Sequence, residues 1–240
     1  MKRSLTALVT GASNGIGEGI SRLFLERGDA VINVDVLAPR QEARAGYTFL
    51  QADLSDAAAT KEVAARIASE FEVDCIINNA GTPTPGFLDD VTDKHFETGV
   101  AITMRTPLIL AQALVPGMRQ RRFGRIVSIS SRAILGKPAR TVYSSTKAAM
   151  VGFTRTWALE LGQHGITVNA IAPGPVITEL FTRNNPPEVA ARLVSQVAVG
   201  RAGTPEDVAR AVLFFCDPDN GFITGQVLHV CGGSSLTVNW

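Results

Sequence analysis

The stretch Thr10-Gly11-Ala12-Ser13-Asn14-Gly15-Ile16-Gly17 stands between an apolar run and an amphipathic one. The apolar run, residues 5–10, predicts a buried strand, and residues 18–27 predict a helix that Gly28 closes. Glycines permit unusual backbone angles at such a junction, and the N-terminus of a helix offers free N–H donors with a partial positive charge. The junction therefore favours a site for the phosphates of a nucleotide over a plain tight turn.

Short apolar runs alternate with amphipathic stretches along the rest of the chain. Strands are predicted over residues 5–10, 30–35, 47–51, 75–79, 125–130, 167–171 and 226–230. Helices are predicted over residues 18–27, 57–71, 93–103, 107–120, 142–161 and 205–215, the last with Thr204 as its N-cap. Strands that are almost wholly apolar are buried on both faces, and alternating helices imply parallel pairing through right-handed crossovers. The predicted fold is one α/β domain over residues 1–240, a Rossmann-type doubly wound parallel seven-stranded sheet with helices on both faces.

Composition narrows the functional classes. The chain has 240 residues, of which 45% are hydrophobic, and its formal net charge is only +1, so neither a nucleic-acid nor a membrane partner is expected. No apolar run reaches the length of a membrane span. The cysteines are odd in number and widely spaced, and the histidines share no ligand spacing, which predicts no disulfide framework and no metal site. A reducing, cytoplasmic setting is expected.

Asp35 ends the second predicted strand. A carboxylate at this place can accept hydrogen bonds from the ribose hydroxyls of a dinucleotide and repel a 2′-phosphate. The next residue is Val36, and Asn14 stands where a basic residue could reach that phosphate. The sequence therefore favours NAD over NADP as the cofactor, with Arg40 and Arg44 downstream as the residues that could instead bind the phosphate.

Tyr143 and Lys147 begin a long predicted helix and, four residues apart, share one face of it. A free tyrosine titrates near pH ~10, too high for an efficient base at neutrality. An ammonium at about 4 Å, at an effective dielectric near 20, would stabilise the phenolate by roughly 4 kcal/mol. That energy equals about three pKa units. The pair predicts a proton-transfer site, the alternative being an ordinary surface pair.

Several motifs, in order along nearly the whole chain, resemble the short-chain dehydrogenase/reductase family, notably its 3-oxoacyl reductase-like and secondary alcohol dehydrogenase members. They are residues 10–17, Asn78-Asn79-Ala80-Gly81, Ser131, Tyr143-Ser144-Ser145-Thr146-Lys147, Pro173-Gly174-Pro175-Val176-Ile177-Thr178, residues 200–207 and Ile223-Thr224-Gly225-Gln226. The resemblance implies that Tyr143 is the general acid/base, Lys147 its electrostatic partner and ribose ligand, and Ser131 the donor to the substrate oxygen. Cofactor binding would fall on Gly11, Ser13, Asn14, Gly15, Ile16, Gly17, Asp35, Asp53, Leu54, Asn79, Ala80, Gly81, Tyr143, Lys147, Pro173, Gly174, Val176 and Thr178.

Two positions depart from the family pattern. Counting from the fifth strand selects Ser131 as the catalytic serine, whereas the usual spacing back from Tyr143 selects Ser130. Alternating strand geometry points these two side chains opposite ways, and we favour Ser131. The second departure is Thr103, which stands where the family usually has an asparagine that helps to shape a helix and to hold a water leading to the lysine.

The resemblance also bears on substrate and assembly. Residues 179–199 would be a mobile substrate loop, in which Phe181, Leu193 and Val197 could cover an apolar substrate, although a plain pair of surface helices fits equally. Arg132, Lys137 and Arg140 could attract an anionic substrate or form a solvated basic loop. A homotetramer or homodimer would form through the helices at 107–120 and 142–161 and the C-terminal strand. The apolar residues noted for it are Leu108, Leu110, Leu114, Met150, Phe153, Trp157 and, in the tail, Trp240.

These features favour an NAD(H)-dependent oxidoreductase that moves a hydride between a nicotinamide and a small-molecule secondary alcohol or ketone. One alternative is an NAD(P)H-dependent 3-oxoacyl thioester reductase, against which Asp35 argues because such reductases usually take NADPH. The other is a regulator that senses a dinucleotide without catalysis. Tyr143 and Lys147 argue against the regulator, whereas Thr103 keeps it open.

Overall fold

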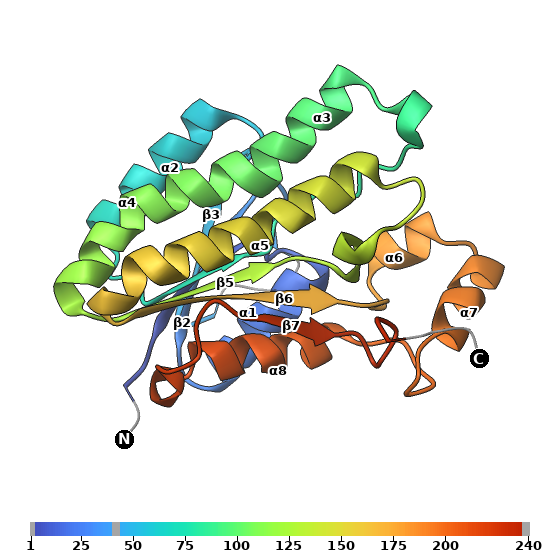
Figure 1. Cartoon of the computed structure of the whole chain (residues 1–240). Helices are drawn as coiled ribbons and strands as arrows, with labels where there is room; N and C mark the ends of the chain where they lie inside the picture. The colour runs from blue at the N-terminus through green and yellow to red at the C-terminus, as the bar shows by residue number, and fades with distance from the viewer. Residues whose placement is uncertain (1–2, 40–43, 237–240) are drawn as a thin grey trace.

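A computed structural model describes residues 3–39 and 44–236 and contains the predicted parallel sheet (Figure 1). Its seven strands, all paired in parallel, lie in the order β3-β2-β1-β4-β5-β6-β7. Their bounds are β1 Thr6–Thr10, β2 Ala30–Asp35, β3 Tyr47–Gln51, β4 Cys75–Asn78, β5 Gly124–Ile129, β6 Ile166–Pro173 and β7 Val227–Val230. The chain order reverses between β1 and β4, and in open parallel sheets ligands bind beyond the carboxyl ends of the strands at such a switch point.

Helices cover both faces of the sheet, as the sequence predicts. Their bounds are α1 Gly15–Glu26, α2 Ala57–Glu70, α3 Asp93–Val100, α4 Thr106–Arg121, α5 Thr141–Leu161, α6 Glu179–Asn184, α7 Pro187–Ser195 and α8 Pro205–Cys216. Figure 1 shows α4 and α5 above the sheet and α8 below it, with α6 and α7 beyond the arrowheads of β6 and β7. One buried cluster joins α2, α4 and α5 to the sheet, and the other joins α1 and α8 to its opposite face. Both faces of the sheet are thus buried under helices, and the carboxyl ends of the strands near α6 remain accessible to a ligand.

Helix α1 begins at Gly15, three residues before the predicted start. Glycine has a low intrinsic helix propensity, so the sequence pattern predicts a helix start only after the glycines. The early start brings the glycine stretch itself into the first helical turn. Gly15 has a φ of +57°, in the left-handed region that favours glycine.

The two helices predicted at 93–103 and 107–120 are joined by a π-helical turn, Ala101–Arg105. Thr103, buried with 3% of its surface exposed, lies at the centre of this turn. Single π turns inside α-helices occur frequently at functional sites. The helix therefore keeps a local distortion at the position where threonine replaces the asparagine usual in the family.

The joined helix, Asp93–Arg121, is 29 residues long and, within the described part of the chain, is the one helix long and apolar enough to cross a membrane. The sequence expectation concerned uninterrupted apolar runs, which Arg105 breaks here, and it treated the two helices as separate. Of its most apolar window, 56% is buried inside the protein, and the core helix of a soluble protein passes the same test. Its length alone is weak evidence for a membrane span.

The side chains noted for subunit contacts lie mostly inside the chain. Leu110, Leu114, Met150 and Trp157 are buried, Phe153 is half-buried and Leu108 is exposed. The four buried side chains stabilise this protomer and offer no surface to a second one. Trp240 lies outside the described residues.

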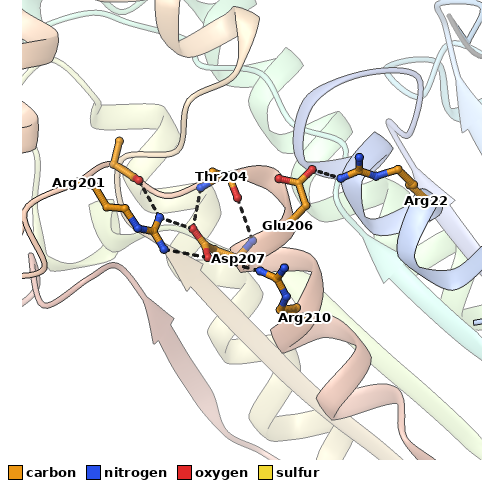
Figure 2. Close-up of polar contacts among 7 residues, drawn as sticks. Arg22, Arg201, Thr204, Glu206, Asp207 and Arg210 are labelled. Carbon is orange, nitrogen blue, oxygen red and sulfur yellow. Dashed lines mark hydrogen bonds and ion pairs between the residues drawn. The ribbon is translucent and has the colours of Figure 1, made fainter. Parts of the chain in front are cut away.

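The segment before α8 is fixed by a polar network, which Figure 2 shows. Thr204 and Asp207 form a capping box, confirming Thr204 as the N-cap of α8. The Asp207 carboxylate also accepts hydrogen bonds from Arg201 at 2.6 and 3.2 Å. Glu206 pairs with Arg22 on α1, so the network links residues 201–207 to the helix that follows the glycine stretch.

We predict that Asp207→Asn lowers the free energy of unfolding by about 1–2 kcal/mol at pH 7, because it removes the charge that Arg201 pairs with and weakens a helix cap. Hydrogen bonds from the Arg201 side chain, then from the Thr204 backbone N–H, hold the pKa of Asp207 at about 2. This contribution is therefore complete above the ordinary pKa of aspartate and is lost as the pH falls towards 2. Urea unfolding at pH 7 and pH 3 should show the difference narrowing at the lower pH. The exposed Asp89→Asn serves as the control, and an equal loss in both variants would contradict the prediction.

Candidate active site

The glycine stretch leaves its backbone open to a ligand. Asn14, the N-cap of α1, makes no side-chain hydrogen bond to the first turn, so the N–H groups there are not capped from within. A Cβ added at Gly17 would lie 2.2 Å from the Gly11 carbonyl oxygen and 2.5 Å from Asn79 Nδ2. The absence of a side chain at Gly17 thus lets α1 pack directly on the strand ends, with its uncapped N-terminus at the site.

A cavity of about 710 Å³ lies beyond the strand ends and brings together most of the residues singled out by the sequence. Such a volume is ordinary for a cofactor and substrate site. Its predicted lining residues are Gly11, Asn14, Gly15, Ile16, Asp35, Asp53, Leu54, Asn79, Ala80, Gly81, Ser131, Tyr143, Lys147, Pro173, Gly174, Val176 and Thr178. Ser13 and Gly17 do not line it. They lie behind the wall and support it.

Asp35 is buried and faces the cavity at the end of β2. Its two carboxylate oxygens accept hydrogen bonds from the backbone N–H of Ser13, at 3.0 Å, and of Leu37, at 3.1 Å. Each oxygen keeps a lone pair for a further donor. Val36 also lines the cavity, whereas Arg44 does not, and Arg40 lies outside the described residues.

The first and fourth strand ends are joined by polar contacts. The Asn79 amide donates to the carbonyl oxygens of Thr10 and Gly11, both at 2.9 Å. The Thr10 hydroxyl accepts from the backbone N–H groups of Asn79 and Ala80, both at 3.0 Å. Asn79 therefore holds the glycine stretch in place, a supporting role that spacing alone does not reveal.

Lys147 is buried on α5, and its ammonium donates to the Ile129 carbonyl oxygen at 2.6 Å. Its Nζ lies 5.9 Å from the centre of the Tyr143 ring. Burial lowers the pKa of Lys147 to about 8. The side chain therefore stays protonated at neutral pH, held between the end of β5 and Tyr143.

The expected lowering of the pKa of Tyr143 is wrong for the chain by itself. Burial raises the pKa of Tyr143 above its ordinary value, and the opposing hydrogen bond with Ser131 and charge of Arg140 are smaller effects. The expectation placed an ammonium about 4 Å away in a solvated medium and neglected the desolvation of the phenolate. A further positive charge is needed to make this phenol an effective base.

The two serines have different surroundings. Ser130 is buried and donates to the Lys147 carbonyl oxygen at 2.8 Å, which ties β5 to α5. Ser131 is partly exposed, and its Oγ accepts from the Ala133 N–H at 3.1 Å. Its own hydrogen can therefore donate, and donation towards Tyr143 acts to lower the pKa of that phenol. This geometry supports Ser131 over Ser130 as the serine that meets a substrate.

Residues 179–199 fold as α6 and α7, separated at Asn185 and Pro186. Phe181 and Leu193 line the cavity as expected, whereas Val197 does not and is buried. The cavity is also lined by Thr82 and Pro83 after β4 and by Ile102 in the π turn, which the sequence did not predict. The motif next to Thr82 could have found the first two, but no signal marks Ile102, because its place follows from the π turn.

Comparisons with known proteins agree with this geometry. Residues 11–235 match the family model described as enoyl-(acyl carrier protein) reductase. The chain is 37% identical over 239 residues to the (2S)-((R)-hydroxy(phenyl)methyl)succinyl-CoA dehydrogenase subunit BbsD of Thauera aromatica, covering 96% of each. It is 34% identical to the 3-oxoacyl-(acyl-carrier-protein) reductase FabG of Escherichia coli, covering 95% of this chain and 96% of the relative.

A solved structure from Beutenbergia cavernae, assigned as an NAD(P)-dependent gluconate 5-dehydrogenase with NADP bound at low occupancy, has a TM-score of 0.92. It is 30% identical to this chain, with 97% of each chain covered. The chain therefore belongs to the short-chain dehydrogenase/reductase family. It is an oxidoreductase that acts on a CH–OH group or ketone with a nicotinamide dinucleotide.

We predict that Ser131→Ala lowers kcat/KM by about 10²–10³-fold, as removal of a donor to a reacting oxygen does in other enzymes. Ser130→Ala is its matched control, because it removes the neighbouring hydroxyl, whose partner is the Lys147 carbonyl oxygen. We expect Ser130→Ala to lower the melting temperature and to reduce kcat/KM far less than Ser131→Ala does. Steady-state kinetics and thermal unfolding of both variants decide; the reverse order of activity losses would assign the role to Ser130.

Proposed function

We propose that this chain is an NAD(H)-dependent alcohol dehydrogenase or ketone reductase for secondary alcohols, in which Tyr143 is the general acid/base. The observation that carries the proposal is the convergence of Ser131, Tyr143 and Lys147 on the cavity that the glycine stretch and Asp35 also line. The uncapped N-terminus of α1 and the close packing at Gly17 fit the pyrophosphate of a dinucleotide. When bound, the nicotinamide supplies the hydride acceptor or donor.

In the reducing direction, the Tyr143 hydroxyl donates its proton to the carbonyl oxygen of the substrate as the carbonyl carbon receives the hydride. Ser131 donates a hydrogen bond to the same oxygen. In the oxidising direction, the Tyr143 phenolate takes the proton of the alcohol. Preorganised donors at the oxygen on which charge develops are the main source of catalysis in such a site.

Lys147 supplies a positive charge to the site at neutral pH. Its ammonium donates to the Ile129 carbonyl oxygen at 2.6 Å, and the site of a Gly81 side chain would lie 3.2 Å from its Nζ. Gly81 thus leaves room beside the ammonium, where a ribose hydroxyl could accept a hydrogen bond. The same charge favours the phenolate of Tyr143, against the burial that disfavours it.

We predict that Tyr143→Phe lowers kcat by about 10³-fold or more, because proton transfer by a placed side chain contributes roughly 10²–10⁴-fold. Initial rates with a panel of secondary alcohols and NAD⁺, followed at the nicotinamide absorbance, measure this. NADH binding, followed by fluorescence, serves as the control for an intact cofactor site. Turnover that survives Tyr143→Phe would refute the proposed chemistry. Tight NADH binding without any turnover by the wild type would favour the sensing regulator.

NAD rather than NADP is proposed on the strength of Asp35. Its carboxylate is buried, faces the cavity and is held by the N–H groups of Ser13 and Leu37. A second negative charge brought next to it would be repelled in a medium of low dielectric. The neighbouring residues that line the cavity, Val36 and Leu37, are apolar and offer a 2′-phosphate no cationic side chain.

We predict that kcat/KM for NADH exceeds kcat/KM for NADPH by about tenfold or more in the wild type. In Asp35→Asn this NADH-to-NADPH ratio should fall by about tenfold, because the substitution removes about 1.4 kcal/mol of repulsion between the carboxylate and the 2′-phosphate. Asparagine keeps one oxygen to accept from the loop N–H groups. Rates with both cofactors at one substrate concentration measure the ratio, and the melting temperature checks that the loop survives. A wild type that prefers NADPH would contradict the prediction.

A 3-oxoacyl thioester reductase is the second candidate. It is favoured by the match to FabG of Escherichia coli and by the first relative described above, whose name gives a CoA thioester as its substrate. The cavity also accommodates an apolar acyl chain, since Phe181, Leu180 and Leu193 line it. Thioesters of 3-oxo acids therefore belong in the substrate panel.

We also infer that the whole chain works as one domain, with residues 179–199 as the substrate loop. A homotetramer or homodimer and a cytoplasmic setting stay predictions. The apolar residues that support an assembly are Leu159, Phe222 and Leu228, which are exposed on the protomer. Leu159 lies on α5 and Leu228 on β7, two of the regions that the resemblance implies, whereas Phe222 lies between α8 and β7.

A further inference from the structure

Three cations lie between the strand that ends near Ser131 and the helix that carries Tyr143. Arg132, Lys137 and Arg140 all line the cavity, on the side of the two hydroxyls. The sequence left open whether they form a solvated basic loop or an anion site. Their common placement on the wall of the substrate cavity favours the anion site.

The two arginines are held in place by carbonyl oxygens. Arg132 Nη1 donates to the Ser234 carbonyl oxygen and Arg140 Nη1 to the Ala139 carbonyl oxygen, both at 2.8 Å. The backbone around Arg140 is itself fixed, because Gly86 donates to Ala139 at 3.1 Å and pairs with Arg140. A guanidinium has five N–H donors, so each arginine is oriented and still has donors to offer.

No carboxylate neutralises these three cations within the described part of the chain. The ion pairs found there involve Arg3, Arg22, Arg27, Arg66, Arg121, Arg201 and Arg210. Desolvation in the cavity wall, then the charges of Arg140 and Arg132, lowers the pKa of Lys137, whose side chain also reaches solvent. Like charges held together without a counter-ion repel one another, and an anion that binds between them reduces this repulsion.

The charges of the cavity are also unevenly distributed. Asp35, the last residue of β2, and Asp53, which follows β3, lie where the dinucleotide ribose and base are expected. The three cations follow β5, next to Ser131 in the chain and before Tyr143. On α6, Arg183 and Glu179 both line the cavity, and Glu179 is the one other carboxylate to do so within the described residues. The field therefore draws a negative group towards the reacting hydroxyls and away from the adenosine side.

Resting on the proposed function, we propose that the substrate of this site carries an anionic group a few bonds from its carbonyl or carbinol carbon, bound by Lys137 and Arg140 with Arg132 behind them. Arg140 is close enough to Tyr143 to act on its phenol electrostatically, which sets the anion near the reacting oxygen. The anion is the carboxylate of an oxo or hydroxy acid, because the phosphates of a thioester carrier are separated from the thioester carbonyl by the whole pantetheine arm. Charge-assisted hydrogen bonds from the cations would hold this carboxylate.

Matched substrates separate a carboxylate from a carrier phosphate. The pairs are 3-oxobutanoate and its methyl ester, 4-oxopentanoate and its methyl ester, and 3-oxobutanoyl-CoA and the corresponding N-acetylcysteamine thioester. The wild type should favour the charged member of at least one oxo-acid pair in kcat/KM by about tenfold or more, the size of a hydrogen bond to a charged group. Equal rates within both oxo-acid pairs would overturn the proposal. A preference confined to the CoA pair would place the anion on the carrier and would overturn it too.

Lys137→Gln and Arg140→Gln test the residues. Each variant should lower the ratio of kcat/KM for the charged substrate to kcat/KM for its neutral partner by about tenfold. The change should come mainly from a higher KM for the charged substrate. Lys61→Gln, which removes the same charge from an exposed position on α2 outside the cavity, is the control and should leave the ratio as it is. If the cavity variants lower both members of a pair equally, the cations serve the fold and the proposal fails.

A binding measurement separates this proposal from the proposed function. Calorimetric titration of the NADH-loaded enzyme with pentanoate and with methyl pentanoate needs no turnover, and 3′-phosphoadenosine 5′-phosphate serves as the probe for a carrier phosphate. Pentanoate should bind to the wild type and about tenfold more weakly to Lys137→Gln. If no ketone or alcohol is turned over but this difference holds, the proposed function fails and the anion site stands. If pentanoate does not bind to an active enzyme, the anion site fails alone.

Discussion

The ammonium of Lys147, buried against the Ile129 carbonyl oxygen, is the interaction on which the geometry of the site depends. It fixes the first turns of α5 against the end of β5, and the Ser130 hydroxyl repeats the link in the opposite direction by donating to the Lys147 carbonyl oxygen. The charge has a cost. Because burial holds the pKa of Lys147 at about 8, below its ordinary value, the penalty is present at neutral pH and is relieved as the pH rises through 8. The fold accepts this penalty to keep a cation beside Tyr143.

Around this centre the cavity has two sides that differ in charge. The carboxylates come from the ends of β2 and β3, and the uncompensated cations from the segment between β5 and α5. The order of the sheet separates these strand ends. The carboxylates are therefore placed to accept from the hydroxyls of a dinucleotide, and the cations are placed to bind the anionic substrate that we propose. Family membership defines the first of these tasks, and the second is the one proposed for the cation-rich segment.

The site is supported by residues whose role becomes visible only through their contacts. Thr10 and Asn79 join the first and fourth strand ends, and the capping network of Thr204 and Asp207 fixes the chain after α7. Arg125 shows how far such contacts can depart from composition. It follows Arg119, Arg121 and Arg122, and a basic run of this kind is typical of a solvated helix end. Arg125 is nevertheless buried, donates to the Gly124 and Pro218 carbonyl oxygens and stacks on Phe123.

The sequence by itself determined the α/β fold, most strand bounds to within a residue or two, and the residues that meet at the strand ends, because hydrophobic periodicity and parallel strand order are local and additive signals. Only the tertiary structure decided three other matters. It joined two helices through a π turn at Thr103, gave Ser130 and Ser131 different partners, and raised the pKa of Tyr143 where the sequence predicted the opposite. Each depends on desolvation or on contacts between segments far apart in the chain. Spacing along the sequence contains no information about how much water a group loses on folding.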